Sequence, residues 1–399
     1  MAEDLFEAEQ RRRLTLKPGK ERAVRNRHPW VFAGAIGRES GPEDAAIADL
    51  VDANGAVLAQ GFHSRTSQIR LRALTFGDEE LSAELVRARI ARAIAARRRW
   101  LDDGTNAVRL IHAEGDDLSG LVVDKYDDVL VVEIANRGLE RLKPLVIAAL
   151  QRELAPRLIY CKNDLPARKL EQLSLDAEVI GDGEPAAIIR EHGLRFRVDP
   201  AAGQKTGFFL DQRENRELAR FHAQGRRVLN LFSYSGAFGV YAAAGGAAEV
   251  ENVDISAPAI EAARTNHELN ELTANARFTV ADVFKFVRER AAVDQRADVV
   301  VCDPPAFAKS RNDVERAARG YKDVNLYAMR LVEPGGLLMT FSCSGHMSLD
   351  LFQKVLFAAA IDIGRRVSFV RRLGAGPDHP ISLYCPEGEY LKGFLLRVE

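Results

Sequence analysis

The sequence predicts an α/β protein whose second half is a Rossmann-like parallel sheet with helices on both faces. From residue 228 onward, short apolar strands alternate with helical stretches, which is the pattern of such a sheet. Two of these strands run directly into tight polar clusters, Asp303-Pro-Pro305 and Ser342-Cys-Ser344. Strands end in this way where their carboxyl ends form an active site. A length of 399 residues leaves room for further domains before this sheet.

The composition narrows the class of protein but does not identify a partner. Apolar residues make up 47% of the chain and the net charge is −1, as in many soluble globular proteins. No apolar run approaches the roughly eighteen residues of a membrane span, and the first residues lack a secretory core. The four cysteines are far apart and form no CxxC pair, which argues against a metal site or a disulfide framework: they are Cys161, Cys302, Cys343 and Cys385. We therefore expect a cytoplasmic protein without a metal or a membrane.

The first section, residues 12–78, is expected to be a small β-rich module. Its strands are expected at Ala46–Val51, Ala56–Phe62 and Ile69–Ala73, separated by turn sequences. Between Arg11 and Arg38, nine basic residues accompany a single acidic one. A basic cluster in an otherwise balanced chain indicates contact with phosphate groups.

A central module is expected over residues 79–192. It begins with an arginine-rich helix at Ser82–Leu101, whose arginines form either a solvated face or a second phosphate contact. Strands and one helix follow, and we find no catalytic pattern among them: Leu121–Asp124, Val129–Ile134, Leu142–Leu154 (helix) and Arg157–Cys161.

The third section, residues 193–399, carries the predicted parallel sheet. A helix at Ala257–Glu271 can be capped by Ser256 and started by Pro258. Val367–Leu373 and Tyr390–Val398 have no clear helix between them and are expected to form an antiparallel edge pair. The parallel strands are expected at Val228–Phe232, Glu249–Asp254, Arg277–Val280, Asp298–Cys302 and Leu337–Phe341.

The turn after the first of these strands predicts the class of cofactor. A dinucleotide site favours a Gly-x-Gly-x-x-Gly turn, which lets the backbone approach a pyrophosphate. Here only Gly236 and Gly239 are glycines, and Phe232 and Tyr234 stand where a glycine is expected. The turn therefore argues against a nicotinamide or flavin dinucleotide. It suits a ligand with adenosine but no pyrophosphate, S-adenosylmethionine, contacted by the residues of the turn: Phe232, Ser233, Tyr234, Ser235 and Gly236.

Acidic residues at the ends of the following strands extend this cofactor site. Asp254 lies eighteen residues after Gly236 and is placed to bind ribose hydroxyls, with Ser256 beside it. Asp282, at the end of the next strand, is placed to meet the adenine amine. For each acid the alternative is a helix N-cap.

The segment Gly203–Arg213 lies just upstream of the sheet. It is either a lid over the methionine end of the cofactor or an amphipathic cap on the sheet. As a lid it would contribute Lys205, Asp211 and Arg213 to cofactor binding.

The two polar clusters predict the chemistry. The prolines after Asp303 stiffen their turn, so that a fixed carboxylate can hold a planar base near the methyl donor. Asp-Pro-Pro loops of this kind serve methyl transfer to an exocyclic nitrogen, which needs no thiol. Cys343 instead favours a carbon target, because a thiolate added to C6 of cytosine makes C5 nucleophilic. We predict Cys343 as the nucleophile and Cys302, which alternates away from Asp303, as a core residue.

Together these motifs resemble the bacterial 23S rRNA large-subunit methyltransferase I family over nearly the whole chain. The motifs are Arg27-His-Pro-Trp-Val-Phe32, Lys205–Arg213, Asn230–Gly236, Asp303–Phe307, Arg319–Asp323, Phe341–Gly345 and Asp378-His-Pro380. The resemblance implies an N-terminal PUA domain that binds RNA, a small central α/β domain and a class I methyltransferase domain dependent on S-adenosylmethionine. It further implies C5 methylation of a cytosine in 23S rRNA through Cys343.

RNA contacts are then expected from Arg25, Arg27, His28, Trp30 and Lys309. Two alternatives remain open: methylation of an rRNA guanine without a cysteine nucleophile, and a non-catalytic RNA-binding assembly factor. The base that removes the C5 proton is not identified; Asp303, His379 and a water are candidates. The sequence leaves both a monomer and a homodimer open.

Overall fold

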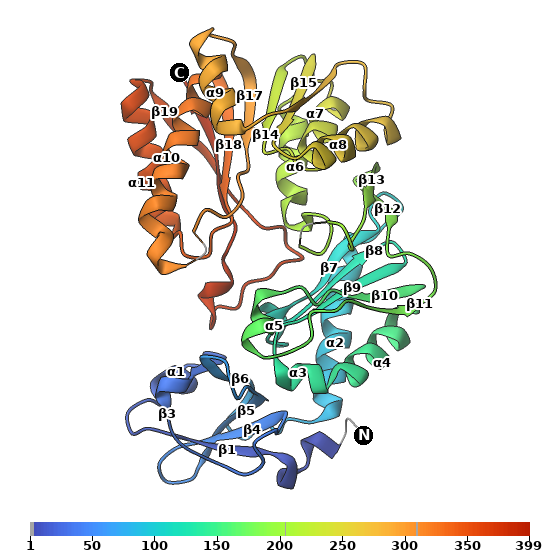
Figure 1. The fold of residues 1–399 in the computed structure, drawn as a ribbon, viewed down its shortest axis with the longest axis vertical. Coiled ribbons are helices and arrows are strands. Elements are labelled where there is room, and N and C mark those ends of the chain that lie inside the picture. Colours follow the sequence, from blue (N-terminus) through green and yellow to red (C-terminus); the bar gives the residue numbers. More distant parts are fainter. Residues whose placement is uncertain (1–3, 204, 309) are drawn as a thin grey trace. The chain divides into compact units, whose positions relative to one another are not determined.

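The computed structural model describes residues 4–203, 205–308 and 310–399, and Figure 1 shows their course. The chain divides into two compact units. Unit 1 comprises residues 1–189, 198–209 and 377–388, and unit 2 comprises residues 190–197, 210–376 and 389–399. The chain therefore passes between the units several times. In the described part of the chain, no helix is long and apolar enough to cross a membrane.

Unit 1 begins with a six-stranded sheet in the order β2-β6-β5-β4-β1-β3. Leu14, Leu50 and Leu71 are fully buried in its core. A short helix, α1 (Arg22–Arg25), lies between the first two strands. The strands are β1 (Arg12–Leu16), β2 (Trp30–Phe32), β3 (Ile36–Ser40), β4 (Ile47–Val51), β5 (Val57–His63) and β6 (Ile69–Phe76).

A second sheet of unit 1 has five strands in the order β11-β10-β9-β8-β7. Its helices are α2 (Ala83–Arg97), α3 (Arg137–Arg141), α4 (Lys143–Leu154) and α5 (Pro166–Leu170). Its strands are β7 (Ala107–His112), β8 (Leu121–Tyr126), β9 (Val129–Ile134), β10 (Leu158–Cys161) and β11 (Glu178–Gly181). Val108, Leu130 and Leu150 are among its fully buried side chains.

Two arginines of α2 are buried, and one of them, Arg89, serves neither of the roles expected for the arginines of that helix. Arg89 is 7% exposed and donates hydrogen bonds to the carbonyls of Leu74 and Asp117. Arg97 is 3% exposed and forms a two-pronged ion pair with Asp116. Both arginines are thus structural, because a buried guanidinium requires such partners.

Unit 2 is built on a seven-stranded sheet in the order β16-β15-β14-β17-β18-β20-β19. The first five are parallel neighbours, whereas β20 pairs antiparallel with both β18 and β19. The strands are β14 (Arg227–Leu231), β15 (Glu249–Asp254), β16 (Ala276–Val280), β17 (Ala297–Cys302), β18 (Val332–Ser342), β19 (Val367–Gly374) and β20 (Lys392–Val398). The hairpin of β12 (Ala187–Glu191) and β13 (Leu194–Val198) precedes them.

Helices cover both faces of this sheet (Figure 1). Along β17 the side chains alternate between the faces: Val299 and Val301 pack with α6 and α7, and Val300 and Cys302 with α9, α10 and α11. The helices are α6 (Arg213–Phe221), α7 (Ala237–Ala244), α8 (Ala257–Leu269), α9 (Val283–Ala292), α10 (Val314–Arg330) and α11 (Leu349–Ile363). Burial of Cys302 confirms that it is a core residue.

The parallel sheet and its antiparallel edge are thus confirmed, whereas three strands in the basic segment were missed. In β1 only Leu14 and Leu16 are buried, and arginines occupy the first two positions. The short β2 and the largely exposed β3 offer still less apolar pattern. Pairing with neighbouring strands, rather than local apolar content, fixes these elements.

Candidate functional site

The carboxyl ends of the parallel strands β14, β15, β16 and β17 lie on one edge of the unit 2 sheet, as does the carboxyl end of β18. In an open α/β sheet this edge is where ligands bind. The residues predicted from the sequence that follow these strands are Phe232 to Gly236, Asp254, Asp282, Asp303 and Cys343.

The turn after β14 is wound tightly. Phe232 and Tyr234 have φ values of 56° and 46°, and Gly236 has φ 72°. A Cβ on Gly236 would lie 2.6 Å from Cβ of Ala263 on α8, a distance that no real side chain tolerates. Only glycine fits there, because the turn packs directly on α8 while taking a left-handed conformation.

The turn also presents a buried hydroxyl. Ser233 is 7% exposed, and its Oγ has no hydrogen-bond partner among the described residues. Its backbone N–H donates to Val253 O at 3.0 Å. A buried polar atom without a partner is costly, so this hydroxyl fits a ligand that brings its own polar groups to the turn.

Asp254, at the end of β15, organises this turn. One carboxylate oxygen accepts the N–H of Tyr234 and the other accepts the N–H of Ser256, both at 2.9 Å. The hydroxyl of Ser256 in turn caps α8 by accepting the N–H of Ala259. Each carboxylate oxygen keeps a further lone pair, so the role of Asp254 toward ribose stays a prediction.

Asp282 forms the helix N-cap that was its alternative role. Its side chain accepts the N–H of Lys285 at 3.0 Å, at the start of α9. Asp282 is exposed after the end of β16. Contact between its second carboxylate oxygen and an adenine amine stays a prediction. The ring of Phe232 meets that of Phe284 on α9 at 6.2 Å, edge to face, which provides an apolar wall nearby.

Asp303 is held from the side by the segment before α6. Nε2 of Gln212 donates to its carboxylate at 2.9 Å, and Asn215 donates to Gln212 Oε1 at 2.6 Å. Asp211, 3% exposed, accepts the hydroxyl proton of Tyr390 at 2.6 Å. Gln212, Asn215 and Tyr390 were not singled out from the sequence, since nothing in a single sequence indicates which amides meet a strand end.

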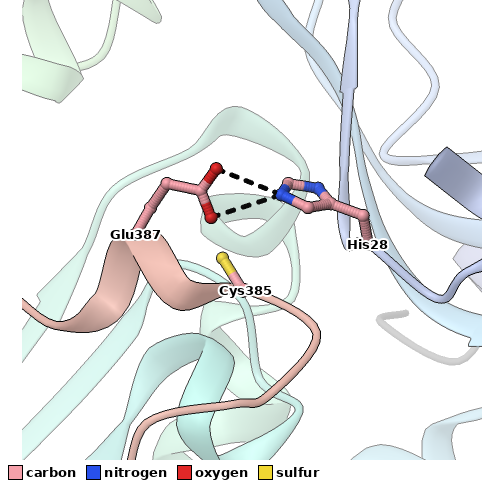
Figure 2. A group of neighbouring side chains, drawn as sticks. All are labelled: His28, Cys385 and Glu387. Atoms are coloured by element: carbon pink, nitrogen blue, oxygen red, sulfur yellow. Dashed lines mark hydrogen bonds and ion pairs between the residues drawn. The ribbon is translucent and has the colours of Figure 1, made fainter.

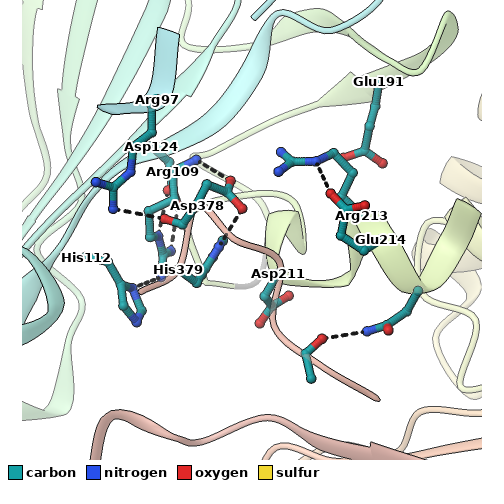
Figure 3. Close-up of polar contacts among 12 residues, drawn as sticks. Arg97, Arg109, His112, Asp124, Glu191, Asp211, Arg213, Glu214, Asp378 and His379 are labelled. Atoms are coloured by element: carbon teal, nitrogen blue, oxygen red, sulfur yellow. Dashed lines mark hydrogen bonds and ion pairs between the residues drawn. The ribbon is translucent and has the colours of Figure 1, made fainter. Parts of the chain in front are cut away.

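The predicted lid residues lie in different surroundings. Arg213 is 1% exposed and contacts Glu214 at 3.3 Å (Figure 3). Lys205 belongs to unit 1, where its ammonium nitrogen lies 4.4 Å from the centre of the Phe209 ring. Binding of the methionine end of a cofactor by Lys205, Asp211 and Arg213 stays a prediction.

Cys343 lies at the end of β18, next to the loop that begins with Asp303. Its Sγ is half-buried and lies 3.9 Å from the carbonyl oxygen of Pro304. The other three thiols are buried, and burial raises the pKa of Cys161 to about 11, that of Cys385 to about 12 and that of Cys302 further still. Those three thiols therefore stay protonated at neutral pH, whereas Cys343 is the half-buried thiol of the four, and its role as a nucleophile stays a prediction.

Ser344 connects the two polar clusters. Its Oγ accepts the N–H of Ala308 at 3.2 Å and lies 3.0 Å from the hydroxyl of Tyr321. Its carbonyl accepts a hydrogen bond of 2.8 Å from the ammonium of Lys392, a buried residue at the start of β20. No role was predicted for Lys392, because a lysine near the start of an edge strand is usually exposed to solvent.

Some of the predicted RNA-binding residues of the basic module are exposed, and others are held by hydrogen bonds. Arg25 and Arg27 are exposed on and after α1. Trp30 is half-buried, and its indole N–H donates to Glu114 at 2.8 Å. Phe32, not singled out before, is 51% exposed. Lys309 lies outside the described residues, so its predicted role has no structural counterpart.

His28 faces the segment of unit 1 that contains residues 377–388 (Figure 2). Its Nε2 lies 3.3 Å from Glu387, and the sulfur of Cys385 is close by; the ligand atoms lie within 4.8 Å of one another. However, Nδ1 of His28 faces the N–H of Trp30 at 3.1 Å. Since Nδ1 accepts there, the neutral ring carries its proton on Nε2 and donates to Glu387. This arrangement suits a hydrogen bond better than a metal.

A buried network in unit 1 anchors the other end of the same segment (Figure 3). Asp378 accepts the backbone N–H of Arg109 at 3.0 Å and lies 3.1 Å from Nδ1 of His379. Arg109 also forms a two-pronged ion pair with Asp124. His379 is 4% exposed and is engaged in this anchor, which makes it a poor candidate for proton abstraction.

Comparisons with known proteins agree with the fold. A family described as S-adenosylmethionine-dependent methyltransferase matches residues 109–395, and one described as PUA-like domain matches residues 14–76. Two curated relatives are named Ribosomal RNA large subunit methyltransferase I. The one from Shewanella denitrificans is 44% identical over 393 residues, and the one from Serratia proteamaculans is 43% identical over 396 residues. Each alignment covers 97% of this chain and 99% of the relative.

Two solved structures share the fold of the chain. One is a methyltransferase complexed with SAH, with a TM-score of 0.83 and 22% identity. The other is a SAM-dependent methyltransferase from Streptococcus mutans, with a TM-score of 0.82 and 21% identity. In both cases the similarity covers 97% of this chain and all of the other.

Proposed function

The chain belongs to the ribosomal RNA large subunit methyltransferase I family, and from this premise we propose that it methylates C5 of a cytosine in 23S rRNA. It carries a PUA-like domain and the fold of S-adenosylmethionine-dependent methyltransferases. The choice of a carbon rather than a nitrogen as the methylated atom rests on one observation. The half-buried thiol of Cys343 lies beside the Asp303-Pro-Pro loop, while the other three thiols are buried.

In this proposal the cofactor is S-adenosylmethionine, which supplies an electrophilic methyl group when bound. The orphaned Ser233 hydroxyl, the tight turn ending at Gly236 and the carboxylate of Asp254 would hold its adenosine part. Asp282 would meet the adenine at the rim. The Phe232 side chain adds apolar contact. This set fits adenosine, because it combines polar groups for ribose with aromatic surface for a planar ring.

Cys343 would act as the covalent catalyst. Its thiolate would add to C6 of the cytosine and open the C5–C6 double bond, and the electron pair at C5 would then accept the methyl group as the bond from that group to the cofactor sulfur breaks. A base then removes the C5 proton, the double bond re-forms, and the C6–S bond breaks to release the thiolate. Asp303, held by Gln212, would orient the cytosine by accepting a hydrogen bond from its exocyclic amine.

RNA would be bound in part by the basic module. Arg25 and Arg27 are exposed and supply charges for phosphates. Phe32, in the same module, offers an exposed ring on which an unpaired nucleobase can stack. His28 and Trp30 are held by Glu387 and Glu114, and we assign them to shaping this surface.

The test uses full-length protein, labelled cofactor and 23S rRNA from a strain that lacks the protein. We expect Cys343→Ala to abolish methylation and Cys385→Ala, a buried thiol in unit 1, to leave it largely intact. RNA containing 5-fluorocytosine should form a stable adduct with the wild-type protein and with Cys385→Ala, but not with Cys343→Ala, because the fluorine at C5 cannot be removed as a proton is. Unimpaired turnover by Cys343→Ala would exclude the thiol mechanism.

Mapping of the modified nucleoside separates this proposal from its closest alternative. A product methylated on guanine, formed without Cys343, would favour the nitrogen-directed use of the Asp303-Pro-Pro loop. The absence of any methyl transfer under conditions where RNA binds would favour an assembly factor.

A further inference from the structure

Lys392 is a buried cation next to the proposed nucleophile. It is the first residue of β20 and pairs in register with Ser342 on β18 and Gly374 on β19. Its side chain is buried, with 3% of the residue exposed, and its ammonium donates to the carbonyl oxygen of Ser344 at 2.8 Å. The strand pairing therefore brings a positive charge to the residue that follows Cys343.

This charge lacks a carboxylate partner. Among the residues that the structure describes, no aspartate or glutamate forms an ion pair with Lys392 within 4.0 Å. Burial lowers the pKa of Lys392, and Cys343, followed by Glu389, acts in the opposite direction. A buried ammonium favours a nearby anion over a neutral group. The sulfur of Cys343 can become such an anion.

We propose that Lys392 is a positioning residue whose ammonium charge keeps the sulfur of Cys343 in its thiolate form, ready to attack the pyrimidine. This inference rests on the proposed nucleophilic role of Cys343. The S–H bond breaks, the proton passes to solvent, and the sulfur keeps the electron pair, while Lys392 remains protonated throughout. Cationic neighbours stabilise thiolates in this way in reactive cysteine sites generally.

The surroundings hold the pair in place. Ser344 is fully buried and is bound from three sides, by Lys392, Ala308 and Tyr321. The backbone that carries the thiol therefore cannot move independently of the lysine. A lysine that served only to bind the Ser344 carbonyl would have no effect on the ionisation of Cys343. The two roles of Lys392 can therefore be separated by measuring that ionisation.

Four other ionisable groups of the described residues belong to the segments next to the pair. Tyr321 on α10 has its pKa raised mainly by burial, with Cys343 contributing. Asp303 precedes Pro304, the carbonyl of which faces the thiol. Glu389 lies just before β20, and His346 is exposed on the turn after Gly345. None of these four groups is a buried cation, whereas Lys392 is both cationic and buried.

The experiment measures the pH dependence of alkylation of Cys343 by iodoacetamide, followed by mass mapping of the modified peptide. Thiolates react and thiols do not, so the midpoint reports ionisation without any need for methyl transfer. In the wild-type protein we expect a midpoint below the value of about 8.5 for a free cysteine. Lys392→Met should raise the midpoint by roughly one to two pH units. Lys392→Arg, which keeps the charge, should lie close to the wild type.

The rate of methylation should rank the variants of Lys392 in the same order as the alkylation midpoint does. At neutral pH, Lys392→Met should lose roughly tenfold or more in kcat and recover part of it at alkaline pH. The matched control is Lys354→Met, an exposed lysine on α11 that pairs with Asp350; it should change neither the midpoint nor the rate. If Lys392→Met does not fold, Lys392→Gln and the wild-type midpoint still test the proposal.

Two outcomes would overturn the inference. One is a wild-type midpoint at or above that of free cysteine. The other is a variant that loses methylation while the midpoint is unchanged, which would leave Lys392 a purely structural role. Failure of the proposed function is distinguishable, since Cys343→Ala would then retain methylation whatever the alkylation midpoint.

Discussion

Gln212 donates a hydrogen bond of 2.9 Å to the carboxylate of Asp303, and its own side-chain oxygen accepts one from Asn215. The carboxylate of Asp303 is therefore oriented by the amide of Gln212, which is in turn oriented by Asn215. Such a chain fixes the rotamer of Asp303 before any ligand arrives, which is how a site avoids reorganisation during the reaction.

Gln212→Leu should therefore reduce turnover more than cofactor affinity. The apolar side chain keeps approximate size but removes the donor, so Asp303 can rotate away from its working position. We expect kcat to fall about 10- to 100-fold, and calorimetric binding of S-adenosylhomocysteine to change less than about threefold. A large loss of binding with unchanged kcat would instead place Asp303 among the cofactor contacts alone.

Gly236→Ala tests the tight turn after β14. The new Cβ would lie 2.6 Å from Ala263 in a left-handed conformation, so we expect a loss of roughly 3 kcal/mol in the free energy of unfolding and weakened cofactor binding. Gly225→Ala is the matched control. It has a similar φ of 67° but nothing within 4 Å of the added Cβ, and it should cost about 1 kcal/mol without affecting binding. Urea unfolding and calorimetry measure both quantities.

Glu133 on β9 makes the stability of unit 1 dependent on pH. Burial raises its pKa from 4.5 to about 7, although the nearby Arg109 opposes this. Its contribution to stability is therefore present below about pH 4.5 and is lost as the pH rises through 7. Glu133→Gln should raise the free energy of unfolding by roughly 2 kcal/mol at pH 8 and by little at pH 4.5. The exposed Glu261→Gln should show no such pH-dependent gain in parallel urea titrations.

Arg25 and Arg27 should contribute to RNA affinity rather than to chemistry. The double variant Arg25→Gln/Arg27→Gln should weaken binding about tenfold and reduce the slope of log affinity against log salt by about two. Turnover at saturating RNA should stay unchanged. Arg152→Gln, which removes an exposed arginine next to Glu153, is the control. An unchanged salt dependence of RNA affinity in the double variant would mean that other residues bind the RNA.

The sequence was sufficient for the parallel sheet because its pattern is local. The run Val299 to Cys302 is apolar throughout, as a strand covered on both faces has to be, and Asp303 follows at once. The carboxyl ends of such strands share one edge, so Asp254, Asp303 and Cys343 could be grouped without coordinates. The antiparallel edge was also predictable, since no helix separates Val367–Leu373 from Tyr390–Val398.

The remaining features depend on contacts between distant residues. Arg89 is buried because the carbonyls of Leu74 and Asp117 accept its hydrogen bonds, whereas Arg92 on the same helix is exposed. Lys392 is buried because β20 inserts between β18 and β19, while the local pattern suggests a solvated strand end. Gln212 orients Asp303 across ninety-one positions. Such pairings follow from the topology and not from spacing or propensity.

The position of β20 also has a consequence for biosynthesis. Among the strands of the described residues, β19 has one neighbour in the sheet, β20, which follows it in the chain. During translation, residues 367–374 therefore remain without a strand partner until residues 392–398 have left the ribosome. Lys392 reaches Ser344 only at that stage, so a nascent chain can carry the cysteine and the whole turn after β14 while the surroundings of the cysteine are still incomplete. Catalytic competence would then arise late in synthesis, when the last strand enters the sheet.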